Sequence, residues 1–194
     1  MTETPIFDED ISTYSRLLFL LRKDDSTQLI RNDSVAHASV LVENMVKNSK
    51  REILIYSSSF CKSFYLSDKV REAFELSNSN NVSLKVLIHY DLAANEALVG
   101  QQETIKAYIE EIYNNNNFEY RFLSPSQEIG LENRILNNFM VVDRKAFRYE
   151  KVVPSKESCL SGIPPKTLAI GSINDTDTAN ILADAFDNAF RNSK

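Results

Sequence analysis

The sequence predicts one α/β domain whose mixed β-sheet is flanked by helices on both faces. Segments with helical and strand periodicity alternate along the chain, and this order is typical of a sheet covered by helices. A strand–turn–strand pattern at 134–150 comes late in the order. Such a hairpin adds antiparallel strands, so the sheet should be mixed rather than wholly parallel. The length of 194 residues, with 43% hydrophobic residues, suits a single core.

Helices are predicted where apolar residues recur at spacings of three and four, which places them on one face. The clearest start is at Asp33 or Ser34, because either side chain can cap the helix that follows. The predicted helices span residues 14–22, 35–48, 67–76, 102–113 and 176–191.

Strands are predicted where short apolar or alternating runs stand between these helices. The predicted strands lie at 27–30, 53–56, 83–91, 118–123, the two arms of 134–150, and 167–175. The hairpin is expected to turn at Arg144 and Lys145. We expect residues 1–33 to form an N-terminal extension with a short helix, and residues 34–194 to form the α/β domain.

Composition narrows the functional classes. The net charge of -5 gives no overall attraction to nucleic acid or to an anionic membrane, although a local basic cluster can still bind phosphate. No apolar segment has the length that a membrane span requires, and we expect a cytoplasmic protein. Cys61 and Cys159 lie far apart, so two free thiols are the simpler interpretation, with a disulfide as the alternative. No metal-ligand cluster or cofactor motif stands out, so neither a metal nor a cofactor is expected.

Two segments carry a family resemblance. "LNNFMVVD" (Leu136 to Asp143) precedes the predicted turn, and "GSIN" (Gly171 to Asn174) follows a later strand. Together with the element order, they resemble the phospholipase D-like superfamily, whose members carry His-x-Lys-x4-Asp on a strand, followed by Gly-Ser and often Asn. The resemblance covers most of residues 34–191 and implies a phospholipase D-like mixed sheet.

The same resemblance implies that the family's catalytic His and Lys are absent from this chain. Placing Asp143 on the family's Asp puts Leu136 in place of the His that attacks phosphorus, and Asn138 in place of the Lys that binds phosphate oxygens. Leucine has no lone pair for this attack, and asparagine supplies no cation. We therefore expect a degenerate active site in a protein that is not an enzyme.

The expected role is that of a pseudoenzyme acting as a binding or regulatory subunit of a larger assembly, with a protein partner or a second copy of the chain. From the family resemblance, a bacterial antiviral defence system is one such assembly. The alternative is a nucleic-acid-binding protein, or a phosphodiesterase or nuclease with a divergent active site.

Polar residues near the predicted strand ends are candidates for a residual pocket, because ligands of open α/β sheets gather at the carboxyl ends of strands. The candidates are Ser57, Ser58, His89, Asp91, Asn138, Asp143, Ser172 and Asn174. For His89, a structural role bonded to a loop carbonyl is the simpler alternative. The other histidine, His37, flanks the apolar face of its helix, and we expect a structural role for it.

Two further groups of residues have open interpretations. Lys47, Lys50 and Arg51 lie at the end of the helix 35–48, where they either complement the helix dipole or contact phosphate. Aromatic residues in the segment 60–65 belong either to the core or to a partner surface. The candidates for this surface are Phe60, Phe64 and Tyr65.

Overall fold

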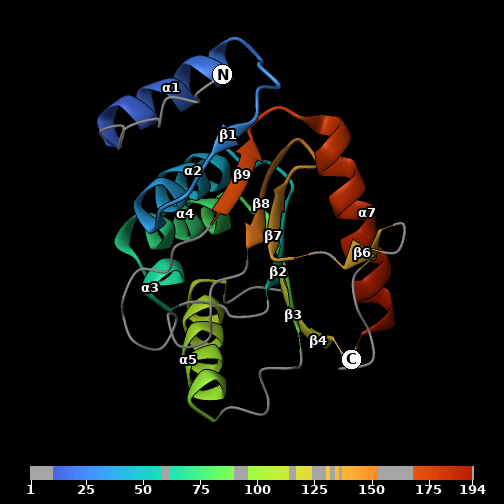
Figure 1. The fold of residues 1–194 in the computed structure, drawn as a ribbon. Coiled ribbons are helices and arrows are strands. Elements are labelled where there is room, and N and C mark those ends of the chain that lie inside the picture. The colour runs from blue at the N-terminus through green and yellow to red at the C-terminus, as the bar shows by residue number, and fades with distance from the viewer. Residues whose placement is uncertain are drawn as a thin grey trace.

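A mixed sheet forms the centre of the molecule (Figure 1). The computed structural model describes residues 11–57, 62–89, 96–113, 117–123, 130–131, 134–135, 137–152 and 168–193. Seven strands lie in the order β1 (Ile30–Arg31), β9 (Leu168–Ser172), β8 (Ala146–Val152), β7 (Phe139–Val142), β2 (Glu52–Ser57), β3 (Ser83–His89) and β4 (Phe118–Leu123). β2, β3 and β4 are parallel, whereas β7, β8, β9 and β1 pair antiparallel. The predicted mixed sheet is confirmed.

Helices cover both faces of this sheet (Figure 1). The helices are α1 (Ile11–Lys23), α2 (Val35–Lys47), α3 (Lys62–Tyr65), α4 (Asp68–Ser79), α5 (Glu96–Ile112) and α7 (Thr176–Asn192). α2, α4 and α5 bury their apolar faces on one side of the sheet, and α7 packs on the other side. A separate pair of short antiparallel strands is formed by β5 (Gly130–Leu131) and β6 (Arg134–Ile135). Among the described residues, no helix is long and apolar enough to cross a membrane.

Side-chain caps fix where two of the helices begin. Ser34 Oγ accepts a hydrogen bond from the backbone N–H of His37 at 3.1 Å, so Ser34 is the cap of α2. At the start of α7, Asp175 Oδ1 accepts a hydrogen bond from the backbone N–H of Thr178 at 3.0 Å. Each cap satisfies a backbone donor that has no partner within the helix.

The turn of the β7–β8 hairpin begins one residue earlier than predicted. Asp143 and Arg144 have φ angles of 54° and 55°, and Lys145 N–H donates to the carbonyl of Val142 at 3.0 Å. Val142 pairs with Ala146, so the loop spans the three residues 143–145. The predicted turn at Arg144 and Lys145 lies within this loop but omits Asp143, whose left-handed backbone begins it.

The N-terminal segment joins the same core. Tyr14, Leu18 and Leu21 of α1 are buried, and α1 packs on α2. β1 pairs antiparallel with β9 and forms one edge of the seven-stranded sheet. Residues 11–33 thus supply both a helix and an edge strand to the fold.

Candidate functional site

A buried polar cluster lies on the α2 side of the sheet, at the end where β2 stops. Strand register brings Asn138 beside Ser57 on one side and beside Glu150 on the other. Glu150 N–H donates to the carbonyl of Asn138 at 2.9 Å, which fixes this pairing. Arg148 lies two residues before Glu150 on β8 and therefore shares its face of the sheet. Asn32, which follows β1, completes the group, which we name the Arg148 cluster: Asn32, Ser57, Asn138, Arg148 and Glu150.

Hydrogen bonds connect the members of the Arg148 cluster. Arg148 Nη1 lies 2.7 Å from Glu150 Oε1, with side-chain exposures of only 8% and 9%. Glu150 Oε2 accepts from Asn138 Nδ2 at 2.8 Å, and Arg148 Nε donates to Asn32 Oδ1 at 3.3 Å. An ion pair so deeply buried persists only when further hydrogen bonds satisfy its remaining atoms, and the two asparagines supply them.

The short helix α3 packs over this cluster. The ring of Phe64 lies 5.6 Å from Arg148 Cζ, and Tyr65 shares a hydrogen bond with Ser57. Burial is the main cause that raises the pKa of Tyr65; the nearby Glu150 also raises it, while Arg148 and the Ser57 hydrogen bond act against the rise. Tyr65 therefore stays a neutral hydroxyl at ordinary pH.

Of the two interpretations of Phe64 and Tyr65, this packing favours the core over a partner surface. Phe64 is buried with 9% exposure, and Tyr65 is half-buried against the core. Both face the Arg148 cluster because α3 follows the end of β2 closely, and a buried guanidinium favours an aromatic ring beside it.

The predicted residual pocket is divided between the two ends of the sheet. Ser57 and Asn138 belong to the Arg148 cluster, but Ser172 pairs with Phe147 near the opposite end of β8. Asn174 donates to the carbonyl of Leu21 at 3.3 Å at that same end. The structure therefore does not bring Ser172 and Asn174 together with Ser57. β9 runs antiparallel to β8, so the carboxyl end of β9 lies at the opposite end of the strands from Ser57.

Asp143 also lies at the far end, where it has a structural role. Its carboxylate accepts from the backbone N–H groups of Lys50, Arg51 and Glu52 at 2.7, 2.8 and 3.0 Å. These bonds tie the hairpin turn to the start of β2. Three backbone donors occupy the carboxylate, so it is not part of the Arg148 cluster.

Several predicted positions lie outside the described residues: Ser58, Phe60, Cys61, Asp91, Leu136, Cys159 and the stretch 153–166. β3 ends at His89, at the same edge as Ser57, and the His89 side chain is not described. The ring of His37 packs 4.5 Å from that of Tyr14.

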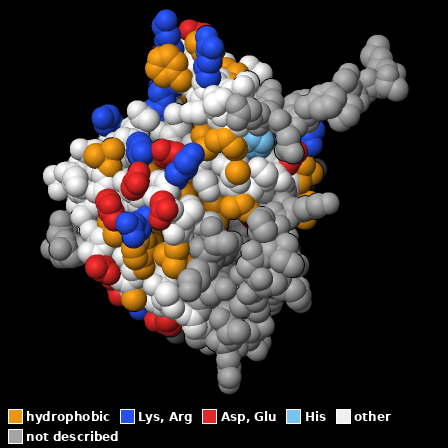
Figure 2. All heavy atoms as spheres, turned by 90° about the vertical axis from the view of Figure 1, so that its left-hand side faces the viewer, with side chains coloured by type: hydrophobic (Ala, Val, Ile, Leu, Met, Phe, Trp, Pro, Cys, Tyr) orange, Lys and Arg blue, Asp and Glu red, His pale blue; other side chains and the backbone are white. Residues whose placement is uncertain are grey.

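The predicted basic cluster is largely engaged within the chain. Lys47 pairs with Glu43 at 2.7 Å, and Arg51 Nη2 donates to the carbonyl of Asp143 at 2.7 Å. On the face that carries α1 and α4, basic and acidic side chains are interspersed over the coloured part of the surface (Figure 2). Lys47 and Arg51 thus each have a side-chain partner within the chain.

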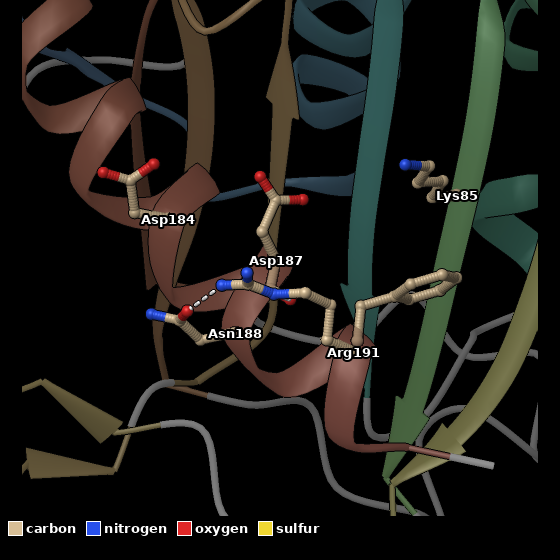
Figure 3. Close-up of a pocket in the computed structure, with 6 residues that line it drawn as sticks. Lys85, Asp184, Asp187, Asn188 and Arg191 are labelled. Carbon is tan, nitrogen blue, oxygen red and sulfur yellow. Dashed lines mark hydrogen bonds between the residues drawn. The ribbon is translucent and has the colours of Figure 1, made fainter.

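A surface groove of about 500 Å³ lies on the other side of the sheet, between α7 and β3. Its lining includes Lys85, Asp187 and Arg191, and Figure 3 shows Arg191 bonded to Asn188. Asp187 also pairs with Arg144. No member of the Arg148 cluster lines this groove, so the two features are separate.

Sequence reasoning missed Arg148, Glu150 and Asn32. The signal for the first two was available, since a three-residue turn at 143–145 places Glu150 opposite Asn138 and Arg148 on the same face. With that register, Arg148 places a cation near Asn138, a residue that itself supplies none. Asn32 gave no local signal, because only the pairing of β1 with β9 carries it into the cluster.

Comparisons with known proteins show the fold. No family model matches the sequence, and no curated protein matches it. The structure is similar to a phospholipase D family member, Nuc from Salmonella typhimurium, with a TM-score of 0.58 and 14% identity, covering 86% of this chain and 96% of that one. It is also similar to phosphatidylserine synthase from Haemophilus influenzae Rd KW20, with a TM-score of 0.59 and 8% identity, covering 86% and 39%.

A third similar structure is TrmBL2, an archaeal chromatin protein whose structure shows a mode of DNA binding. Its TM-score is 0.52 at 14% identity, covering 94% of this chain and 62% of that one. The expectation that this chain is not an enzyme is contradicted by these comparisons, because structures similar over most of its length include a phospholipase D family member and a synthase. The chain has the phospholipase D-like fold, as its sequence predicted.

Proposed function

We propose that this chain binds a phosphodiester group at the Arg148 cluster, with nucleic acid as the substrate class. One observation carries the proposal: a buried guanidinium stands two hydrogen bonds from Asn138, the position where the family resemblance places the phosphate-binding Lys. The cation is supplied by the neighbouring strand instead of by residue 138. The phospholipase D family member and the DNA-binding chromatin protein among the similar structures support this ligand class.

The guanidinium keeps a donor for a ligand. Arg148 uses Nε toward Asn32 and Nη1 toward Glu150, and among the residues that the structure describes Nη2 has no hydrogen-bond partner. Arginine presents its donors in a rigid fork that matches phosphate oxygens. The neutral hydroxyl of Tyr65 adjoins the same cluster through Ser57. A neutral hydroxyl can donate a hydrogen bond to a phosphate oxygen and does not repel the phosphate charge.

The test is a binding titration with the full chain and a fluorescein-labelled single-stranded oligothymidine, repeated over a salt series. Arg148→Gln should weaken binding at least about tenfold and lower the salt dependence, because a phosphate contact and its released counterion are lost. Arg121→Gln is the matched control, since Arg121 lies on the other face and donates to the Phe190 carbonyl. Binding that Arg148→Gln leaves unchanged, with both variants folded by circular dichroism, would contradict the proposal.

Phosphodiester hydrolysis is the second candidate, favoured by the enzymes among the similar structures. Purified chain would be incubated with bis(p-nitrophenyl) phosphate, with and without divalent metal. Release of p-nitrophenol that Arg148→Gln abolishes and Arg121→Gln preserves would support it. Equal release by both variants would assign the turnover to a contaminant or another site.

A regulatory role in a larger assembly, including an antiviral one, stays a prediction from the sequence. Co-purification from the native host at gentle salt, followed by mass spectrometry, tests it. Recovery of the chain only as a free monomer would count against it.

A further inference from the structure

The N-terminal segment delivers one amide into the Arg148 cluster. Asn32 follows β1, and its backbone N–H donates to the carbonyl of Ala169 on β9 at 3.0 Å. Its exposure is 0%, so the side chain is held inside the protein. The edge strand β1 therefore sets the position of Asn32 relative to Arg148.

The orientation of this amide follows from its partner. Arg148 has only donors, so the atom of Asn32 that meets Nε must be the carbonyl oxygen Oδ1. Nδ2 then points away from Nε, and it is buried without a hydrogen-bond partner among the described residues. A buried amide donor that stays unpaired is destabilising, so a native structure that keeps one requires an explanation.

We propose that Asn32 Nδ2 and Arg148 Nη2 together bind the two free oxygens of a phosphodiester. This inference rests on the proposed function and names its ligand group. The Nε–H and one Nη2–H of a guanidinium point to the same side, so Asn32, bonded at Nε, lies on the side of Nη2. Asn32 and one N–H of Nη2 thus lie on the same side of the guanidinium.

The charge of the cluster favours a phosphodiester over a phosphomonoester. Glu150 already balances Arg148, so the site has no excess positive charge to offset a second negative charge on the ligand. A phosphodiester carries one negative charge, whereas a phosphomonoester carries nearly two at neutral pH. Repulsion from Glu150 therefore favours the diester.

The experiment compares bis(p-nitrophenyl) phosphate with p-nitrophenyl phosphate as probes of the full chain, at a pH and on a timescale that exclude turnover. Wild type should bind the diester at least about tenfold more tightly, equivalent to ~1.4 kcal/mol. Asn32→Asp, which replaces the donor by an acceptor of the same shape, should lose diester binding about tenfold or more. Asn174→Ala is the control, since this buried asparagine lies at the far end of the sheet.

A second measurement does not depend on how well the variants fold. In ¹⁵N-labelled wild type, the Asn32 side-chain amide signals should shift on adding the diester. If they stay fixed while Arg148→Gln abolishes binding, the inference about Asn32 is overturned and the proposed function stands. If wild type binds neither probe, both are overturned.

Discussion

Asn138 and Glu150 face each other across the β7–β8 pair, with Asn138 Nδ2 2.8 Å from Glu150 Oε2 inside the protein. Glu150 uses its other oxygen for Arg148 at 2.7 Å. One carboxylate therefore links the position that resembles the family's phosphate-binding Lys to a cation on the next strand.

The Arg148–Glu150 pair should be energetically coupled. Arg148→Met leaves Glu150 buried without its cation and should lower the free energy of unfolding by about 3–5 kcal/mol. The double change Arg148→Met/Glu150→Leu should restore most of that loss, because no unpaired charge remains. Urea unfolding of the single and double variants measures the coupling. A double variant as unstable as the sum of the two single variants would show that the pair is not coupled.

Asp143 should be important for stability through its carboxylate and its backbone. Asp143→Ala removes the acceptor for three backbone N–H groups and places a non-polar residue at a φ of 54°. We expect a loss of about 2 kcal/mol or more. Asp143→Asn keeps one side-chain oxygen and tolerates the left-handed backbone, so it should lose less. Denaturant midpoints give the stabilities of the two variants, and equal stability would contradict this prediction.

Two glycines should respond to alanine in opposite directions. A Cβ at Gly171 would lie 2.7 Å from the Phe147 carbonyl oxygen and 2.8 Å from Leu41 Cδ2, so Gly171→Ala should destabilise the protein by roughly 1–3 kcal/mol. A Cβ at Gly100, within α5, meets nothing within 4 Å. Gly100→Ala should therefore stabilise the protein by about 0.5–1 kcal/mol. The thermal unfolding midpoints of both variants test this contrast. If both midpoints move in the same direction relative to wild type, the prediction is wrong.

Tyr113 should make stability depend on alkaline pH. Burial raises the pKa of Tyr113 from its ordinary value of 10.0 to about 12, and a hydrogen bond with Ser77 opposes part of this rise. Because the folded pKa is the higher one, the stabilising contribution is fully present below pH 10.0 and is lost as pH rises toward 12. Tyr113→Phe should lose less stability over this interval, measured as unfolding free energy at several pH values. An identical slope in the variant would exclude Tyr113 as the cause.

The sequence predicted the central elements well for a physical reason. β2 contains the apolar run 53–56 and β3 the run 86–88, and α2 and α7 each have an apolar face, so local sequence patterns identify these elements. α5 begins at Glu96, before its predicted start at 102, because the apolar period is clear only in its second half.

The site was less predictable because it depends on tertiary pairing. Arg148 and Glu150 alternate with aromatic residues on β8, a pattern that equally suits an exposed polar face. Among the described residues, α3 and the neighbouring strands pack against them. The "GSIN" segment matched a family motif in letters, yet strand direction places Ser172 at the far end of the sheet.

The central position of β2 has a consequence for synthesis of the chain. β2 pairs with β3 on one side and with β7, which begins at Phe139, on the other. A nascent chain that has completed β4 therefore still exposes the second edge of β2, with Ile53, Leu54 and Ile55 fully buried only in the finished fold. An apolar strand edge left open is a template for pairing with other chains. Truncation after Leu123 should thus yield aggregates, and ribosome pausing before Val142 would prolong the period of risk.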